Sequence, residues 1–389
     1  MVVIAFALCS LLGLLAVEAW RHRRRLRRIP IRIHVNGTRG KSTVTRLIAG
    51  GLRAAGYRVI AKTTGTLPRI ILEDGSEIPV PRRGRATIRE QLAVIALAAR
   101  RQADAVVLEC MAIQPELQRV SERQIVRATI GVITNARRDH TEIMGQTRRD
   151  VAECLALTVP RDATLVVGEQ EQAEVFAEAA SRLGSRVVLA ASLDESERPV
   201  AEELLDFPEN QATALAVCGA LRIDRARACA GMGRAAPDVG ALRVLTVSLK
   251  GKHAIFVNAF SLNDVDSLLS VWGRLERLGR LPAPRTVLLN CRADRPVRSY
   301  DFGRILGGLL AADRLVLMGE ATRHAWRAAV AAGLDSRRIL RREGRSAPAV
   351  AAELAEWVEE GSTVIGAGNF KGAGEAMADH LVRGDAHVS

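Results

Sequence analysis

The sequence predicts an α/β protein with an N-terminal transmembrane helix, a mostly parallel sheet domain and a smaller C-terminal α/β domain. Three observations support this prediction. They are a long apolar run at the N-terminus, strand-like runs that alternate with helical stretches, and a proline-containing, low-pattern boundary near residues 237–240. A chain of 389 residues with 48% apolar content can bury at least two cores, because single domains usually comprise roughly 100 to 200 residues.

The N-terminal run VVIAFALCSLLGLLAVEAW, residues 2–20, has only two polar residues. About 20 such residues span the hydrocarbon core of a bilayer. The arginine cluster at residues 21–28 follows the run, whereas a secretory signal peptide has its positive charge before it. A buried or amphipathic helix is the alternative, but no polar face interrupts the run. The order predicts a single-pass anchor at residues 1–20 and a basic juxtamembrane linker at 21–30.

The arginine cluster also predicts the orientation of the chain. Under the positive-inside rule, arginines beside an apolar span stay in the cytoplasm. We therefore expect a protein of the cell (inner) membrane whose domains after the anchor lie in the cytoplasm.

The segment after the cluster predicts a central domain at residues 31–236. Strand-like runs such as IRIHV at 31–35 and DAVVLEC at 104–110 alternate with helical stretches such as REQLAVIALAARR at 89–101. This alternation is typical of a mostly parallel sheet covered by helices.

The segment after the boundary predicts a second α/β domain at residues 240–385. VLTVSL and HAIFVNAF lie close enough in the chain to form a hairpin. Three further strand-like runs, RTVLLNC, RLVLMG and TVIGAG, follow and are separated by helical stretches.

The segment IHVNGTRGKSTVTRLI has the pattern of a phosphate-binding loop between a strand and a helix, as in P-loop proteins. The full pattern, Gly-x-x-x-x-Gly-Lys-Ser/Thr, would begin with a glycine at the position of Val35. The remaining loop residues are Gly37, Thr38, Gly40, Lys41, Ser42 and Thr43. Backbone N–H groups at such a turn bind phosphate oxygens. The pattern predicts an ATP site in which Lys41 contacts the β- and γ-phosphates and Ser42 holds Mg²⁺.

Two further side chains are candidates for the same site. Glu109 ends an apolar run, so its carboxylate is expected at the carboxyl edge of the sheet beside the loop, where α/β proteins bind ligands. Together with His140 and Ser42 it could serve Mg²⁺ ions that bridge phosphoryl groups. Taken singly, such a glutamate is more often solvated or paired with arginine, and a histidine after Asp139 is more often a surface residue.

The shortened loop resembles that of the Mur ligase superfamily, which makes amide bonds between amino acids with ATP. TTGT at residues 63–66, LECMA, TNARRDH and FPENQATALAV follow in the order of that superfamily. The resemblance implies catalytic and metal-binding roles for Glu109 and His140 beside Lys41. It also implies that Thr64 lies on the substrate side and that Asn210 contacts adenine.

The resemblance narrows to one family. KTTGT, ECMAIQPE, ITNARRDH, NCRADR and GAGNFKGAGE, with the N-terminal anchor, are similar to the ligase subunits of poly-γ-glutamate synthases, the CapB or PgsB type, over residues 1 to about 380. This implies an ATP-dependent ligase that joins glutamate through γ-linkages by way of an acyl phosphate and releases ADP and phosphate. The implied partners are glutamate, the poly-γ-glutamate chain and small membrane subunits of a synthase or export complex.

The second domain contains weaker candidates. By the superfamily resemblance, Arg243 and Asn258 occupy places that contact the γ-phosphate and ribose, although relatives often carry aspartate in place of Asn258. Arg292 and Arg295 follow a strand and suit bidentate capture of a substrate carboxylate. A structural salt bridge is the alternative explanation for this pair.

One departure from the superfamily concerns the second metal ion. Many Mur ligases bind it with a carbamylated lysine in the central domain, but this chain has no lysine between Lys62 and Lys250. The second metal site is therefore open, with Asp139 as a candidate ligand. RRGR at residues 82–85 and the pair Arg137–Arg138 flank the expected site, either to steer a polyanionic product or as a solvated face.

Two alternative functions stay open. One is another Mur-type amino-acid ligase, acting on folate or peptidoglycan precursors. The other is a membrane-anchored ATPase that drives assembly or export of an envelope polymer. The net charge of +13 suggests nucleic-acid binding as well, but aromatic residues make up only 3% of the chain and no recognition motif is present. Nucleic acid is therefore not an expected partner.

Overall fold

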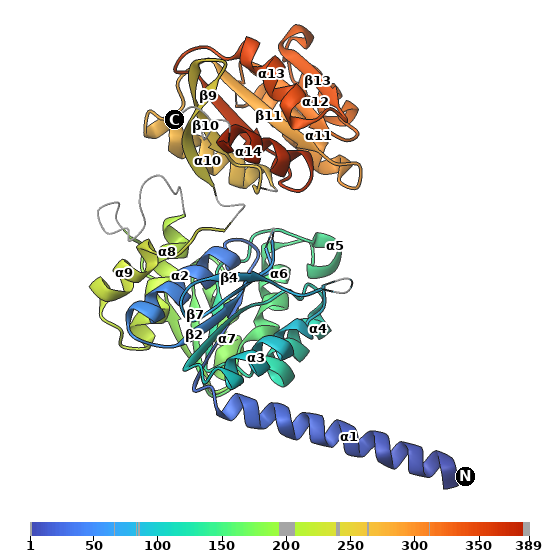
Figure 1. Ribbon diagram of the computed structural model, residues 1–389, viewed down its shortest axis with the longest axis vertical. Coiled ribbons are helices and arrows are strands. Elements are labelled where there is room, and N and C mark those ends of the chain that lie inside the picture. The colour runs from blue at the N-terminus through green and yellow to red at the C-terminus, as the bar shows by residue number, and fades with distance from the viewer. Residues whose placement is uncertain are drawn as a thin grey trace. The chain divides into compact units, whose positions relative to one another are not determined.

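The protein comprises two compact α/β units, each with its own sheet and its own core (Figure 1). The first contains the described residues up to Asp238, and the second contains those from Leu242 onward. The predicted α/β fold class is confirmed. The computed structural model describes residues 2–65, 67–82, 84, 86–193, 207–238, 242–262, 264–310 and 312–383. Parts of the predicted TTGT and RRGR motifs and of the 237–240 boundary therefore lie outside the described residues, namely Thr66, Arg83, Arg85, Val239 and Gly240.

The first unit is built on an eight-stranded sheet with the order β4-β3-β2-β5-β1-β6-β7-β8. The strands are β1 (Ile31–Asn36), β2 (Val59–Lys62), β3 (Arg69–Ile71), β4 (Glu77–Pro79), β5 (Ala105–Glu109), β6 (Ile130–Ile133), β7 (Thr164–Val167) and β8 (Arg186–Leu189). In the spatial order of the sheet, neighbouring strands from β2 through β5, β1, β6 and β7 to β8 pair in parallel. Strands β3 and β4 add an antiparallel edge beside β2.

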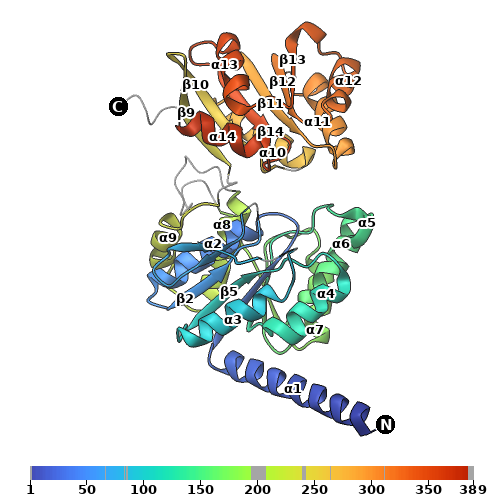
Figure 2. The ribbon, with the colours of Figure 1, turned by 45° about the vertical axis from the view of Figure 1, so that its right-hand side comes forward.

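Helices cover both faces of this sheet (Figures 1 and 2). The helices of the unit, of which α1 projects away from the sheet, are α1 (Val2–Arg27), α2 (Lys41–Ala54), α3 (Glu90–Arg100), α4 (Pro115–Val120), the π-helical turn η1 (Ser121–Val126), α5 (Thr141–Met144), α6 (Arg148–Leu155), the short 3-10 turn η2 (Ala156–Thr158), α7 (Ala173–Arg182), α8 (Pro208–Ala220) and α9 (Arg225–Gly233). One core lies between the sheet and α2, α8 and α9, and two others lie on the opposite face.

Strand β1 occupies the centre of the sheet and has two different faces. Ile33 and Val35 are fully buried in the core under α2. Because side chains alternate along a strand, Arg32, His34 and Asn36 lie on the opposite face. Asn36 Nδ2 donates to Gln118 Oε1 at 2.8 Å and to Thr158 Oγ1 at 3.0 Å. A hydrogen-bonded polar layer therefore lies beside the strand that leads into the phosphate loop.

His34 forms an ion pair within this layer. Its Nδ1 lies 2.8 Å from Glu122 Oε2, and both side chains are almost completely buried. Glu122 Oε1 also accepts a hydrogen bond from the backbone N–H of Ala128 at 2.8 Å. Burial opposes the charged imidazole, but Cys110 and Glu122 beside the ring outweigh it and raise the pKa of His34 to about 10.

Helix α1 combines the predicted anchor with the arginine cluster. By length and composition it could cross a membrane, and its apolar residues before Arg21 are exposed. The helix continues to Arg27, so it includes most of the segment 21–30 that is predicted as a basic juxtamembrane linker. Arginine is a good helix former, and Leu26 is buried against the core under α3. His22 Nε2 lies 2.8 Å from the carbonyl oxygen of Ile125, so this end of α1 is fixed to the unit.

The second unit contains a six-stranded sheet with the order β13-β12-β11-β14-β10-β9. Its strands are β9 (Arg243–Leu249), β10 (Lys252–Asn258), β11 (Arg285–Cys291), β12 (Arg314–Gly319), β13 (Ile339–Glu343) and β14 (Thr363–Ala367). Its helices are α10 (Val265–Arg277), α11 (Pro296–Gly308), α12 (Arg323–Ala331), the 3-10 turn η4 (Ser336–Arg338), α13 (Ala347–Trp357) and α14 (Ala373–Arg383). Strands β9 and β10 form the predicted hairpin, and the other pairs are parallel.

Helix α2, which carries the phosphate loop, crosses α9 at two glycines. A Cβ added to Gly231 would lie 2.3 Å from the carbonyl oxygen of Gly50, and one added to Gly50 would lie 2.6 Å from that of Gly231. Neither distance is possible without separating the helices. The crossing therefore fixes α2 against α9 and keeps the loop at the end of β1.

The first prediction concerns this crossing. Gly231→Ala should lower the free energy of unfolding by about 1–3 kcal/mol, because the added methyl overpacks the helix contact. Gly219→Ala on α8 is the matched control, since nothing lies within 4 Å of its added Cβ. It should be neutral or slightly stabilising, by less than about 1 kcal/mol. Denaturant unfolding of both variants in detergent measures this difference, and equal losses would contradict the crossing.

The second prediction concerns the pH dependence of stability. The folded pKa of His34, about 10, exceeds the ordinary 6.5. Folding therefore favours the protonated ring. The contribution of His34 to the free energy of unfolding is complete below pH 6.5 and is lost as the pH rises through about 10. Over this interval the free energy of unfolding should fall by up to about 1.4 kcal/mol per pH unit. Glu122→Gln should reduce that slope, measured by unfolding between pH 6 and 10. Glu178→Gln, which removes a carboxylate of an exposed pair with Arg182, should leave the slope unchanged.

Candidate active site

The phosphate loop lies between the end of β1 and the start of α2. Gly37 (φ 132°) and Gly40 (φ 78°) adopt conformations that favour glycine. Gly40 is the N-cap of α2 and provides no side-chain cap, so the first N–H groups of the helix remain available for an anion. Lys41 Nζ donates to the carbonyl oxygens of Gly37 at 2.7 Å and Thr38 at 3.3 Å. The ammonium group therefore lies within the loop.

The segment after β6 holds the loop in place. Asn135 Oδ1 accepts from Thr38 Oγ1 at 2.7 Å and from the Arg39 N–H at 3.2 Å. Thr134 Oγ1 donates to the carbonyl oxygen of Arg39 at 2.6 Å. These two residues are not among the site residues expected from the sequence, although both lie in the TNARRDH motif. The sequence feature that could have indicated a role for them is their position directly after a strand.

Glu109 connects the loop with the segment after β2. It is the last residue of β5 and is 2% exposed. Its Oε2 accepts hydrogen bonds from Ser42 Oγ at 2.7 Å and from the backbone N–H of Thr64 at 2.6 Å. The structure thus brings Thr64 to Ser42 and Glu109, two residues that are expected from the sequence to share one metal site. Thr43 follows in the first turn of α2 and is half-buried.

The oxygen atoms at Glu109 suit a hard divalent cation. Mg²⁺ prefers oxygen ligands at 2.0–2.1 Å in octahedral geometry, which places neighbouring ligands about 3 Å apart. Ser42 Oγ and Glu109 Oε2 are separated by a similar distance, 2.7 Å. A carboxylate and a hydroxyl at the head of a phosphate loop therefore fit Mg²⁺ with its nucleotide.

His140 lies close to the loop but is not brought to Glu109 by any hydrogen bond. Asp139 accepts from Arg39 NH1 at 3.0 Å, and its Oδ2 lies 3.9 Å from His140 Nε2. His140 also has φ 45°, which is unusual for a residue other than glycine and frequent at functional sites. Within the described ranges, no group of three His, Cys, Asp or Glu side chains is arranged to hold a metal ion.

Asn210 lies directly against the loop. It is in the first turn of α8 and is 6% exposed. A Cβ added to Gly40 would lie 2.1 Å from its Oδ1. The absence of a side chain at Gly40 therefore allows this close approach of α8 to the phosphate loop.

A buried ion cluster lies beside the segment after β2 that contains Thr64. This cluster is not expected from the sequence. Lys62, the last residue of β2, is completely buried, and its Nζ lies 3.0 Å from Glu90 Oε2. Arg82 Nε lies 2.8 Å from Glu90 Oε1. Burial lowers the pKa of Lys62, although the nearby Glu90 and Glu109 carboxylates oppose that shift. Arg82 belongs to the RRGR motif and is thus paired within the unit.

In the second unit, Arg243 and Asn258 face each other across the β9–β10 hairpin. Asn258 is 6% exposed, and its Oδ1 is buried without a hydrogen-bond partner among the described residues. Such an unpaired acceptor is costly unless a ligand or water satisfies it. Of the structural features at Arg243 and Asn258, this unpaired oxygen is the one that best indicates a bound ligand.

The two arginines of NCRADR differ in their surroundings. Arg292 directs its guanidinium to Asp294, with Nε–Oδ1 2.9 Å and NH2–Oδ2 2.8 Å. Its bidentate face is therefore taken by an internal carboxylate, as in the salt-bridge alternative. Arg295 is the exposed residue before α11.

Two asparagines connect NCRADR with GAGNFKG. Asn290 Nδ2 donates to the carbonyl oxygen of Asn369 at 2.6 Å, and Asn369 Nδ2 donates to that of Asn290 at 3.1 Å. Arg298 NH1 donates to Asn369 Oδ1 at 2.7 Å. The two motifs thus form one rigid edge at the carboxyl ends of β11 and β14.

Two parts of the chain match known families. Residues 35–217 match the Mur ligase middle domain, and residues 244–384 match the poly-gamma-glutamate synthase CapB C-terminal domain.

The fold is shared with solved structures of low sequence identity. FolC of E. coli in complex with DHPP and ADP has a TM-score of 0.69 at 19% identity, covering 96% of this chain and 93% of that chain. The bifunctional folylpolyglutamate synthase/dihydrofolate synthase of Yersinia pestis, complexed with AMPPNP and Mn ion, has a TM-score of 0.69 at 19% identity, covering 93% and 92%. At these identities the likeness establishes the fold alone.

Two relatives establish the family. The capsule biosynthesis protein CapB of Bacillus anthracis is 36% identical over 364 residues, which are 93% of this chain and 78% of that protein. PGA synthase CapB of Bacillus subtilis (strain 168) is 34% identical over 384 residues, which are 98% and 97%. The chain therefore belongs to the CapB family of poly-gamma-glutamate synthases.

Proposed function

We propose that the phosphate loop and Glu109 form the ATP and Mg²⁺ site of a ligase that joins glutamate units through γ-amide bonds. As a CapB family member with a Mur ligase middle domain, the chain is an ATP-dependent amide ligase in poly-γ-glutamate synthesis. The observation that carries the site is the double hydrogen bond to Glu109 Oε2, from Ser42 Oγ and the Thr64 N–H. It places a buried carboxylate at the head of the loop.

The loop residues have distinct proposed roles. The N–H groups at Gly40 and the start of α2 bind phosphate oxygens, and Lys41 neutralises charge on the β- and γ-phosphates. Ser42 and Glu109, with His140, would hold Mg²⁺, which stabilises the charge that develops on the transferred phosphoryl group. Asn210, already against Gly40, is positioned beside the nucleotide, and Thr64 lies where the reacting carboxylate would approach.

The proposed reaction has two displacements. An oxygen of the γ-carboxylate attacks the γ-phosphorus of ATP, and the bond to ADP breaks. The amine of a second glutamate then attacks the carbonyl carbon of the acyl phosphate, loses a proton and displaces inorganic phosphate. No nucleophile from the protein is required. This chain contributes positioning and charge stabilisation, as expected for phosphoryl transfer.

Residues of the second unit supply further proposed ligand groups. Asn258 has a buried, unpaired Oδ1 that can accept from a hydroxyl such as that of ribose. Arg243 lies opposite it on β9 and would contact phosphate. Arg295 is exposed and suits a substrate carboxylate. Arg292 fits this role less well because Asp294 holds its guanidinium.

We further propose that α1 anchors the chain in the cell membrane with both units in the cytoplasm. The apolar run followed by arginines supports this orientation. Small membrane subunits that carry the polymer outward are the proposed partners, because a single anchor offers no export path.

The third prediction tests the ligase reaction. Membranes containing the protein should release phosphate from ATP with Mg²⁺ when L- or D-glutamate is added, and should form a soluble acidic polymer. Glu109→Gln should lower this rate at least about 100-fold, because the metal-binding charge is lost. An amide oxygen can still accept from Ser42 or Thr64, so the fold should persist.

Glu178→Gln is the matched control, because it removes an exposed carboxylate from α7 in the same unit. Its rate should equal that of the unchanged protein. Phosphate release that is indifferent to every amino acid would instead indicate an ATPase of polymer assembly. Stimulation by another amino acid alone would indicate a different Mur-type ligase.

The fourth prediction concerns the anchor. The full chain should remain in the membrane fraction after extraction with alkaline carbonate, and a variant lacking residues 2–20 should be released. In intact cells, external protease should leave the residues after Arg21 uncut. Release of the full chain by carbonate would contradict the anchor, and cleavage by external protease would contradict its orientation.

A further inference from the structure

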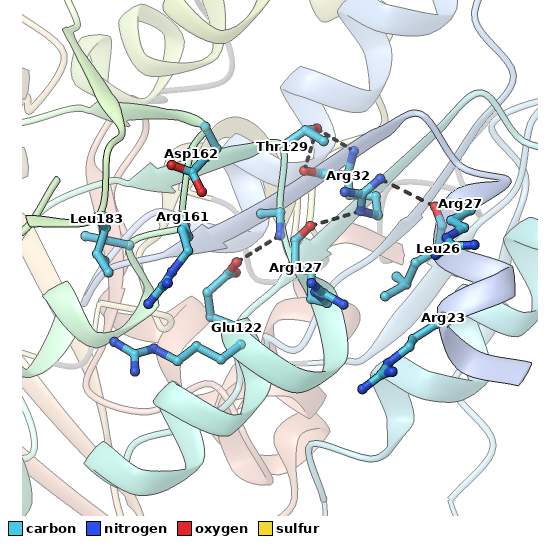
Figure 3. A pocket seen from close by; sticks show the side chains of 14 residues that line it. Arg23, Leu26, Arg27, Arg32, Glu122, Arg127, Thr129, Arg161, Asp162 and Leu183 are labelled. Carbon is cyan, nitrogen blue, oxygen red and sulfur yellow. Dashed lines mark hydrogen bonds between the residues drawn. The ribbon is translucent and has the colours of Figure 1, made fainter. Parts of the chain in front are cut away.

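A cavity lies at the amino edge of the first sheet, the edge opposite to the phosphate loop. Its volume is about 730 Å³, which is within the range of small-molecule sites. Its lining comes from the end of α1, from the start of β1 and from the residues that precede β6, β7 and β8. Figure 3 shows these side chains arriving from separate elements around one space.

The lining of this cavity, here called the arginine pocket, is strongly basic. It includes six arginines, namely Arg23, Arg27, Arg32, Arg123, Arg127 and Arg161. It includes two acidic residues, Glu122 and Asp162. Glu122 is already engaged by His34 and by the Ala128 N–H. The pocket therefore has a large excess of positive charge.

The arginines of the pocket lack carboxylate partners in the part of the chain that the structure describes. Among the described residues, none of these six guanidinium groups forms an ion pair with a carboxylate. Arg32 instead donates to the backbone carbonyls of Arg127 at 2.9 Å and Ile29 at 2.8 Å. Burial lowers the pKa of Arg32, and the charge of Arg127 acts in the same direction although Glu122 opposes it. The charges of Arg32 and Arg127 thus repel each other, and arginines gathered in this way favour a bound anion.

The position of the pocket indicates where that anion comes from. Arg23 and Arg27 belong to α1, three and seven residues after Trp20, the last residue of the apolar run. At a rise of 1.5 Å per residue they lie only about 5 and 10 Å along the helix from that residue. Trp20 is 58% exposed and Arg24 lies 5.5 Å from its ring centroid, as suits a residue at a membrane interface. Leu26 and Leu183 add apolar surface to the same lining.

We propose that the arginine pocket binds the phosphodiester headgroup of an anionic phospholipid from the cytoplasmic leaflet. This inference rests on the anchor proposed above and not on the ligase reaction. Arginine forks match phosphate oxygens in a bidentate manner, and the apolar lining accommodates the glycerol end of the lipid. Bound lipid would join the end of α1 to the segments before β6 and β7. It would thus hold the sheet in one orientation at the membrane surface.

Direct binding to the full chain in a neutral detergent tests the proposal. Native mass spectrometry would count bound molecules of dihexanoyl-phosphatidylglycerol, dihexanoyl-phosphatidylcholine, inorganic phosphate and oligo-γ-glutamate in separate titrations. We expect one saturable site for phosphatidylglycerol, with affinity at least about tenfold higher than for the other three. The assay contains no ATP or glutamate, so its outcome is distinct from that of the ligase test.

Matched variants locate the site. Arg127→Gln with Arg161→Gln should weaken phosphatidylglycerol binding at least about tenfold, and the two lysine substitutions at the same positions should restore part of it. Arg100→Gln with Arg227→Gln removes the same charge from two exposed arginines outside the pocket and should change affinity less than about twofold. If a double variant fails to fold, Arg161→Gln alone serves as the test.

Four outcomes would overturn the proposal. Equal binding of phosphatidylcholine would show that charge is not recognised. Equal binding of inorganic phosphate would identify a free anion as the ligand, and tighter binding of oligo-γ-glutamate would identify the polymer. Equal losses in the pocket and control variants would show that the bound lipid lies elsewhere.

Discussion

The parallel pairing of β1 with β5 on one side and β6 on the other is the constraint on which both ends of the first unit depend. A strand paired on both sides has a fixed direction, and its ends open on opposite edges of the sheet. At the carboxyl end Asn36 leads directly into the phosphate loop, and at the amino end only three residues separate β1 from α1. The six residues of β1 span about 20 Å. They therefore set the distance between the proposed nucleotide site and the arginine pocket.

The parts that could be predicted from sequence are those encoded by local pattern. The change from strand to helical period around Gly40 and the end of the apolar run at Glu109 both placed their residues correctly in the fold. Thr134 and Asn135 could not be assigned to the loop, because they follow it by about 95 residues in the chain and no local pattern encodes the order of strands in a sheet. The partner of Arg292, Asp294, lies only two residues away in the sequence. The partner of Lys62, Glu90, lies on the separate helix α3, and no local pattern links the two residues.

Arginine supplies most of the positive charge of the chain, with only five lysines among 56 basic residues. Composition alone cannot separate structural arginines from arginines that are available to a ligand. The carboxylate partners of their side chains in the structure give that distinction. Arg46 is 3% exposed and pairs with Glu77, so it is a structural residue of α2. The six arginines of the pocket have no such carboxylate partner among the described residues.

The proposed nucleotide site also differs from the arginine pocket in how its charges are satisfied. Lys41 is held by two carbonyl oxygens of its own loop, and Ser42 donates to Glu109. Each group that would meet ATP or Mg²⁺ thus has an internal partner that a phosphate oxygen or metal ion can replace without moving the backbone. Such preorganisation lowers the free energy that binding would otherwise lose in ordering the loop. In the arginine pocket Arg32 is held by two backbone carbonyl oxygens, but among the described residues none of the six arginines pairs with a carboxylate, and the charges of Arg32 and Arg127 repel each other. The first site is therefore expected to stay folded while its nucleotide exchanges, whereas the second gains stability from a ligand that remains bound.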